Sequence, residues 1–141
     1  GCFFGDYASD TTRTVAIGAV PEKLKEIYEV VRVAQELGCQ AARAGISGAD
    51  LDAVCRDYVS SRGYGDYFLH GTGHGLGMEV HELPLVSRKN TDTLPENSVV
   101  TIEPGIYIEG LGGVRIEDAI VLKSNGNINL NSGLTKELLV L

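Results

Sequence analysis

The window from Gly63 to Gly113 constrains this sequence most, because it holds ten of the 18 glycines and all three histidines. Within it, His70 and His74 are spaced so that a helix would place both on one face. The alternate glycines of segment 71–77 oppose that helix, since each costs about 1 kcal/mol in a helix interior. The pattern instead indicates a strand and turns, in which missing Cβ atoms leave room for a metal ion or a substrate beside the imidazoles.

Size and charge exclude several classes of protein. The 141 residues are enough for one domain, and 43% of them are hydrophobic, which is enough for a core. The 12 Lys and Arg face 19 Asp and Glu, for a net charge of −7 without any basic run, so we expect no nucleic-acid partner and no membrane partner. No apolar run approaches the ~20 residues that span a bilayer. The three cysteines, Cys2, Cys39 and Cys55, are widely spaced, which predicts reduced thiols and a cytoplasmic location.

Two helices are predicted in the first half of the chain, after one or two short strands within 2–17. Pro21 suits the first turn of a helix that runs to about Ala44 on a 3–4 apolar spacing. Ser47 is a candidate N-cap for a second helix, with Asp50 in its first turn, and Gly63 ends that helix.

The second half is predicted to be extended, which makes the fold class α+β, with two helices followed by an antiparallel sheet. The segment 82–98, with two prolines and two asparagines, is predicted to be an exposed loop. The predicted strands are Tyr67–Leu69, Gly77–His81, Val99–Ile108, Val114–Leu122, Ile128–Leu130 and Glu137–Leu141.

Carboxylates lie at related positions in two of these strands. Alternation places Glu103 on the same face as Thr101, and Glu117 on the same face as Arg115. A glycine-containing connection joins the two strands, so we expect them to pair antiparallel and to offer one carboxylate each toward the same side. Asp10 shares a predicted strand face with two threonines near the N-terminus.

Carboxylates and imidazole together suit a pair of divalent first-row ions, which activate a water molecule and polarise a carbonyl. An isolated acid is more often on a solvated strand face, and an isolated histidine is more often a hydrogen-bonded structural residue. It is their number and spacing here that predict metal-assisted hydrolysis. No cysteine lies near the cluster, which disfavours a structural zinc site, and no helix follows the glycines, which disfavours a phosphate-binding loop.

Four motifs carry a resemblance to a known family: SDTTRT (9–14), HGTGHGLGMEVHE (70–82), TIEPGIY (101–107) and GVRIED (113–118). In this order they resemble the motifs of the Xaa-Pro peptidases, the prolidase and aminopeptidase P branch of the methionine aminopeptidase-like family. The resemblance implies a pita-bread fold, of which residues 1–141 are the C-terminal part of one catalytic domain. It also implies hydrolysis of a peptide or dipeptide with proline at its second position.

The resemblance further implies roles for individual residues. Asp10, His74, Glu103 and Glu117 match metal ligands, with Asp10 and Glu117 bridging two ions of manganese, cobalt, zinc or iron. Glu103 also matches the residue that handles the proton of the attacking water.

Three more residues match groups that act on the substrate. His81 is similar to a histidine that stabilises the tetrahedral species near the scissile bond. His70 is similar to a second histidine that handles substrate or protons, and Arg115 is similar to an arginine that organises the site beside the last ligand.

One family ligand has no counterpart. The family uses a fifth ligand, an aspartate whose position falls just before Gly1, and its N-terminal half precedes this point. We therefore expect residues 1–141 alone to bind fewer ions or none, to lack peptidase activity, and to associate as a homodimer or with the missing half. Two alternatives stay open: a metal-free pita-bread module that binds peptides or proteins, and a methionine aminopeptidase.

Overall fold

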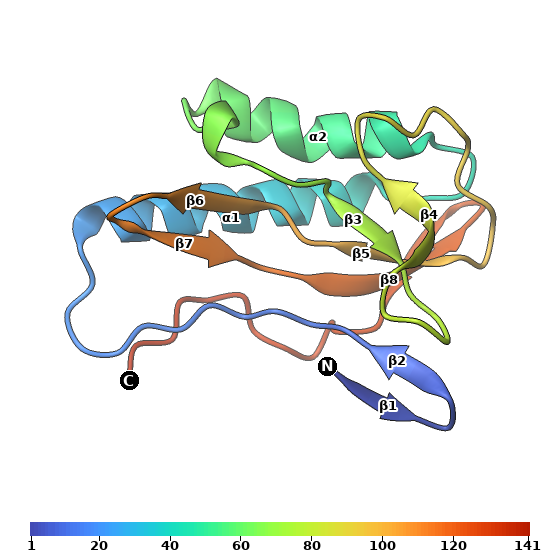
Figure 1. The fold of residues 1–141 in the computed structure, drawn as a ribbon, viewed down its shortest axis with the longest axis horizontal. Helices are drawn as coiled ribbons and strands as arrows, with labels where there is room; N and C mark the ends of the chain where they lie inside the picture. Colours follow the sequence, from blue (N-terminus) through green and yellow to red (C-terminus); the bar gives the residue numbers. More distant parts are fainter.

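The computed structural model describes residues 1–141, with two helices packed on one side of antiparallel strands (Figure 1). Helix α1 (Glu22–Ala41) begins directly after Pro21. Pro21 is the N-cap residue of this helix, whereas the sequence predicts it in the first turn. The helix ends before Ala44 because Ala42 is extended, at φ −62° and ψ 120°. Helix α2 (Gly48–Ser61) confirms the predicted cap, since Ser47 Oγ accepts a hydrogen bond from the backbone N–H of Asp50 at 3.0 Å.

The main sheet has five strands in the order β4-β3-β5-β8-β9, and every pair in it is antiparallel. These strands are β3 (Gly73–Gly75), β4 (Glu82–Val86), β5 (Val99–Ile102), β8 (Asp118–Lys123) and β9 (Gly126–Asn129).

Two further hairpins flank the sheet (Figure 1). One pairs β6 (Gly105–Ile108) with β7 (Gly112–Arg115), and the other pairs β1 (Cys2–Phe4) with β2 (Tyr7–Ser9) near the N-terminus. The β6–β7 hairpin continues the β5–β8 pair after an interruption at residues 103–104 on one side and 116–117 on the other. The predicted antiparallel pairing of the two carboxylate-bearing strands is therefore confirmed, although each predicted strand is split in two.

Several predicted strands are wrong. Segment 67–69 begins with the last residue of a 3₁₀ turn, η1 (Gly65–Tyr67), and segment 77–81 is a bent connection between β3 and β4. The predicted loop 82–98 begins with β4, and residues 137–141 form only an isolated bridge between Val140 and Ala16.

A core of 20 buried residues joins the two helices to the sheet. Gly38 allows the close approach, since a Cβ there would lie 2.5 Å from Cys55 Sγ and 2.8 Å from Ile102. The three cysteines are free, as predicted. Neither helix combines the length and the apolar character that crossing a bilayer requires.

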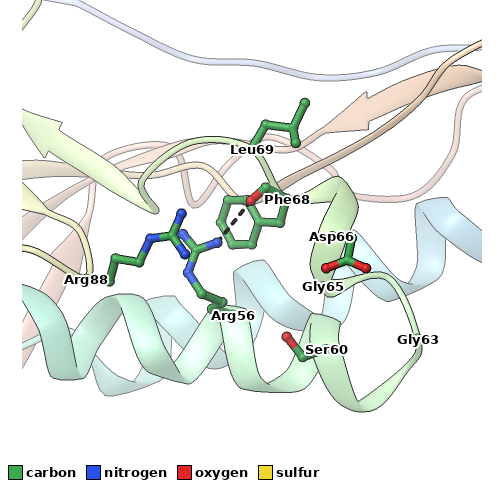
Figure 2. A pocket seen from close by; sticks show the side chains of 8 residues that line it. All are labelled: Arg56, Ser60, Gly63, Gly65, Asp66, Phe68, Leu69 and Arg88. Atoms are coloured by element: carbon green, nitrogen blue, oxygen red, sulfur yellow. Dashed lines mark hydrogen bonds between the residues drawn. The ribbon is translucent and has the colours of Figure 1, made fainter.

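The largest cavity, about 640 Å³, lies between the second half of α2 and η1 (Figure 2). Arg56 and Arg88 line one part of it, and Asp66, within η1, lies at another. The guanidinium of Arg56 stacks over the Phe68 ring, with 4.2 Å between the guanidinium carbon and the ring centroid. This cavity is separate from the residues that the sequence singles out for chemistry.

Candidate metal centre

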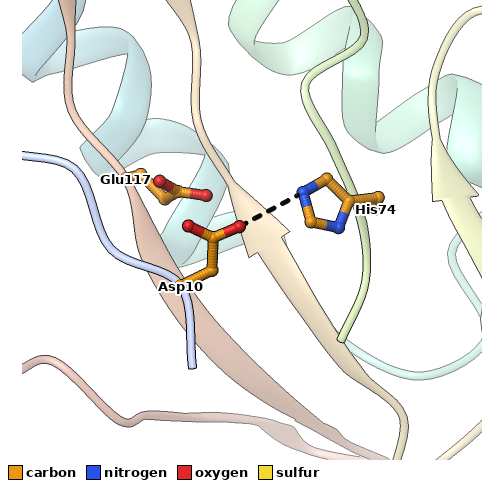
Figure 3. Close-up of side chains that lie close together, drawn as sticks. All are labelled: Asp10, His74 and Glu117. Atoms are coloured by element: carbon orange, nitrogen blue, oxygen red, sulfur yellow. Dashed lines mark ion pairs between the residues drawn. The ribbon is translucent and has the colours of Figure 1, made fainter. Parts of the chain in front are cut away.

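Four segments far apart in sequence bring the predicted ligands together. Potential ligand atoms of Asp10, His74 and Glu117 all lie within 4.8 Å of one another, and Asp10 is placed between the other two (Figure 3). The fourth residue, Glu103, approaches His74, with 3.1 Å between Glu103 Oε1 and His74 Nε2. The four side chains therefore lie close together in the structure, as the sequence predicts.

Both ring nitrogens of His74 have partners. Nδ1 lies 3.0 Å from the carbonyl oxygen of Gly75, while Nε2 faces Glu103 and, at 3.7 Å, Asp10 Oδ2. Burial lowers the pKa of this imidazole, but its hydrogen bonds to Glu103 and Gly75 and the charges of Glu103 and Asp10 outweigh that effect and raise it. When protonated, the ring donates to both partners, and its positive charge then lies among the acids of the site.

Two glycines of segment 71–77 allow a close approach of strands that was not predicted. A Cβ on Gly73 would lie 1.8 Å from the carbonyl oxygen of Thr101, and one on Gly75 would lie 2.4 Å from that of Leu83. At Gly73 and Gly75, the position of the missing side chain is thus occupied by the backbone of a neighbouring strand. Gly71 and Gly73 also line the cavity of about 240 Å³ beside the imidazoles, where the sequence predicts room for a substrate. Glycine lets β3 approach β4 and β5 closely enough to hold His74 at the centre.

Glu103 and Glu117 occupy the interruptions between the paired strands, where regular pairing stops. Thr101 Oγ1 donates to Glu103 at 2.9 Å, and Thr12 Oγ1 donates to Glu117 Oε2 at 2.6 Å. Burial acts to raise the pKa of Glu103, but hydrogen bonds from His74 and Thr101 lower it overall, so this carboxylate is ionised at neutral pH.

Glu117 is the opposite case. Its side chain is 2% exposed, and Oε1 is buried without any hydrogen-bond partner. Burial, with the like charges of Glu103 and Asp10, raises the pKa of Glu117 to about 7. An orphaned, buried carboxylate oxygen that faces two other acids lacks a positive charge, and a divalent cation would supply it. The residues present therefore fit a metal ion.

The predicted substrate-handling residues surround a cavity of about 240 Å³ beside this centre. His70, His81, Glu103 and Arg115 all line it, together with His74. The ring centroids of His81 and His74 are 4.2 Å apart. The structure thus brings all seven predicted site residues to one place.

Neighbours fix two of these lining residues. His70 Nε2 lies 2.8 Å from the hydroxyl of Tyr107, and Arg115 Nε donates to Thr12 Oγ1 at 3.1 Å. Tyr107 was not singled out from the sequence, although it lies within the TIEPGIY motif. Its position on β6, across the site from the histidine segment, is what reveals the contact.

A buried ion pair behind Glu117 was also missed. Asp118 is fully buried and accepts from Arg13 at 2.7 Å and from Lys136 at 2.8 Å. Arg13 also donates to the backbone carbonyl of Glu117 at 2.7 Å. This network joins the N-terminal segment, β8 and the C-terminal segment directly behind the metal centre. Sequence alone offers only the adjacency of Asp118 to Glu117 as a signal.

A second buried pair holds the segment that carries His70. Asp52, fully buried on α2, accepts from Arg56 at 2.7 Å and from the backbone N–H of Thr72 at 2.9 Å. Arg56 in turn donates to the carbonyl oxygens of Phe68 and His70, at 3.0 Å and 2.7 Å. In the sequence, an acid and an arginine four residues apart on a helix resemble an ordinary surface pair, which is why this clamp was not predicted.

Comparison with known proteins decides the family. Residues 1–124 match the metallopeptidase family M24. The chain belongs to this family. The uncharacterised peptidase YqhT of Bacillus subtilis is 52% identical over 141 residues, which are 100% of this chain and 40% of that protein. The Xaa-Pro dipeptidase of Pyrococcus furiosus is 48% identical over 126 residues, which are 89% of this chain and 36% of that protein.

Solved structures confirm the fold of this M24 chain. The Xaa-Pro dipeptidase from Bacillus anthracis superposes with a TM-score of 0.94 at 48% identity, covering 96% of this chain and 38% of that one. The X-Pro aminopeptidase from Thermotoga maritima gives 0.92 at 45% identity, with 96% and 38% covered. The predicted α+β pita-bread fold and the resemblance to Xaa-Pro peptidases are confirmed. The chain spans about two fifths of the length of these relatives.

Proposed function

We propose that the full-length protein containing this chain is a metal-dependent peptidase that hydrolyses Xaa-Pro bonds. The observation that carries the proposal is the convergence of Asp10, His74, Glu103 and Glu117, from four separate motifs, around a buried carboxylate oxygen without a partner. Similarity to Xaa-Pro dipeptidases over most of the chain supports the substrate class.

The proposed ligands are the same four residues, with Asp10 and Glu117 each offering two oxygens that can be shared between two ions. The family resemblance assigns one more ligand to an aspartate before residue 1. Manganese, cobalt, zinc and iron all accept such oxygen and imidazole ligands. When bound, the ions supply Lewis-acid activation of water and of the scissile carbonyl.

The chain's own residues then position the substrate and move protons. Glu103, ionised at neutral pH and oriented by Thr101, accepts a proton at Oε1 or Oε2. His81 and His70 line the adjoining cavity, and His81 can donate a hydrogen bond to a polar group of a bound peptide. The ring nitrogens of His70 already have partners, the Gly71 carbonyl oxygen and the Tyr107 hydroxyl, each at 2.8 Å. The hydroxyl of Tyr107 holds the His70 ring, and Arg115 braces Thr12 beside Glu117.

The orphaned Glu117 oxygen speaks against a metal-free binding module. Such a module gains nothing from a buried carboxylate that has no partner and whose pKa is raised to about 7. A methionine aminopeptidase would have the same ligands, so the substrate must separate these two enzymes.

The test uses the full-length protein loaded with Mn²⁺. We expect hydrolysis of Ala-Pro or Ala-Pro-Ala and none of Met-Ala-Ser. Asp10→Asn should lower kcat/KM by about 100-fold or more, because it removes a charged ligand. Asp57→Asn, at an exposed acid on α2, is the matched control and should change nothing. Cleavage of Met-Ala-Ser alone, or full activity in Asp10→Asn, would overturn the proposal.

The incomplete ligand set gives a second test. A polypeptide limited to residues 1–141 should bind Mn²⁺ weakly by calorimetry and should not hydrolyse Ala-Pro. Turnover by this polypeptide, free of full-length protein, would contradict the proposed need for a fifth ligand.

A further inference from the structure

A second cavity adjoins the proposed catalytic cavity. Its volume is about 220 Å³, and His70 and Gly71 line both cavities. On its other side it is lined by Arg88 and Lys89, which follow strand β4, and by Arg56 of α2. A peptide that leaves the catalytic cavity across His70 and Gly71 therefore reaches these basic residues.

The charge of this second cavity is unusual for the protein. No acidic residue lines it, although the chain as a whole carries a net charge of −7. The charge of Arg56 is compensated by the buried carboxylate of Asp52. Arg88 and Lys89 are exposed and form no ion pair or side-chain hydrogen bond within the chain, so their positive charges are free for a ligand. In Figure 2 the side chain of Arg88 extends beside that of Arg56.

The positive charge of the second cavity would orient a short peptide. Arg88 and Lys89 repel the positively charged amino end of a substrate. A negatively charged group downstream of the scissile bond is favoured at the basic cavity. Each further residue extends a peptide by about 3.3–3.6 Å, so residues after the proline can carry such a group across Gly71.

On the basis of the proposed function, we propose that Arg88 and Lys89 form a subsite that selects Xaa-Pro peptides with a carboxylate beyond the proline. That carboxylate is either the peptide C-terminus or an Asp or Glu side chain. Asp66 lines only the larger cavity farther along α2 and does not line this subsite. The subsite would make longer acidic peptides better substrates than neutral ones.

The test compares kcat/KM of the full-length, Mn²⁺-loaded protein on matched peptides. Ala-Pro-Glu-Ala-NH₂ and Ala-Pro-Ala-Glu-NH₂ are each compared with the same peptide in which Gln replaces Glu. Ala-Pro-Ala is compared with its C-terminal amide. These pairs separate the effect of a side-chain carboxylate from that of the C-terminal carboxylate. They also show which peptide position the subsite recognises. We expect a preference of about fivefold or more for at least one carboxylate in 20 mM salt, which shrinks in 500 mM salt.

Variants then assign the preference to the two residues. The ratio of kcat/KM values for the Glu and Gln peptides should fall to near one in the double variant Arg88→Ala/Lys89→Ala. With Arg88→Glu, a Lys peptide should become the preferred one. Arg43→Ala removes an exposed arginine outside the cavity and should keep the wild-type ratio. Because each ratio is taken within one protein, a change in the amount of folded enzyme does not affect it.

Three results would overturn the inference. These are a wild-type ratio near one for every pair, a preference that survives in the double variant, and cleavage of Ala-Pro with no cleavage of any longer peptide. Failure to cleave any of the peptides, Ala-Pro included, would instead overturn the proposed function, and this inference with it.

Discussion

His74 hydrogen-bonds through both ring nitrogens, to the Gly75 carbonyl and to the Glu103 carboxylate. When the ring is protonated, it places a positive charge among three acids, and these contacts raise its pKa. A divalent ion bound at Nε2 would replace that proton and would also ionise Glu117. Metal uptake should therefore release protons, as it does wherever ligands are protonated in the free protein.

The raised pKa of Glu117 predicts an unusual effect of pH on stability. The folded pKa of about 7 exceeds the ordinary value of 4.5, so the native state binds this proton more tightly than the unfolded state. The contribution of Glu117 to the free energy of unfolding is therefore greatest below pH 4.5 and falls by about 3 kcal/mol as the pH rises through 7. Other groups titrate as well, so Glu117→Gln isolates the effect.

We expect metal-free Glu117→Gln to be more stable than wild type at pH 8, and this advantage to vanish near pH 4.5. Addition of Mn²⁺ should stabilise the wild type at pH 8 and leave the variant unchanged. Urea denaturation at the two pH values, with and without Mn²⁺, measures both effects. Glu109→Gln, in the exposed β6–β7 turn, is the control. A variant that is less stable than wild type at pH 8 without metal would contradict the prediction.

At the scale of elements, the segment after β2 is attached to the β7–β8 region by a few specific bonds. Thr12 Oγ1 donates to Glu117 and accepts from Arg115, and the backbone N–H of Glu117 donates to the Thr12 carbonyl at 3.0 Å. The Thr14 hydroxyl donates to the Arg115 carbonyl at 2.9 Å. These bonds place Asp10 at the metal centre without a regular strand.

Thr12→Val keeps the shape of the side chain but removes the hydroxyl. Glu117 then loses its only side-chain donor, so we expect the free energy of unfolding to fall by about 2 kcal/mol at pH 8 and Mn²⁺ affinity to fall as well. Thr12→Ser retains the hydroxyl and should recover most of both quantities. Urea denaturation and calorimetric titration measure them, and equal losses in the two variants would show that the hydroxyl is not responsible.

The clamp on α2 gives a second prediction at this scale. Arg56→Met leaves Asp52 buried without its cation and frees the carbonyl oxygens of Phe68 and His70, so we expect a loss of about 3 kcal/mol. The double variant Asp52→Asn/Arg56→Met removes the stranded charge and should lose less. Thermal unfolding measures both, with Arg62→Met at the exposed end of α2 as control. A double variant less stable than Arg56→Met would contradict this account.

How far the sequence predicts these elements depends on where their stabilising contacts lie. The limits of α2 were predictable because Ser47, Asp50 and Gly63 act locally. The split of the predicted strands at 103–104 and 116–117 was not, because both interruptions arise where two strands stop pairing with each other. Strand β3 was placed too late because its glycines carry no apolar alternation, and only the tight approach to Thr101 shows that it is a strand.

At the scale of the whole molecule, the site was more predictable than the framework around it. The acids and histidines lie in motifs whose residue types suggest metal chemistry and whose order resembles a family. The bonds of Asp118 to Arg13 and Lys136, and of Arg56 to the His70 segment, join residues that no local pattern connects. They become visible only when the chain is folded.

The exposed apolar side chains give a prediction about association. Phe4 on β1 is 89% exposed, Ile17 85% and Leu83 79%. Two-stranded hairpins such as β1–β2 are marginally stable alone, and the adjacent exposed side chains of Phe3 and Phe4 on β1 favour contact with another chain. We expect a polypeptide of residues 1–141 to show a weight-average mass above 15.0 kDa that rises with concentration in light scattering. The double variant Phe3→Ser/Phe4→Ser should reduce this concentration-dependent increase in mass. A constant mass of 15.0 kDa at all micromolar concentrations would refute association.

The bond between Thr12 and Glu117 closes a loop of 105 positions. Contacts so distant in sequence are among the slowest to form, because the ends of a long flexible segment must meet first. A partly folded intermediate that has formed α1, α2 and the β3–β5 pairing would still lack Asp10 opposite His74. Capture of a cation would then mark a late step of folding, and its arrival could be followed in a refolding experiment as a signal that the segments around Thr12 and Glu117 have met.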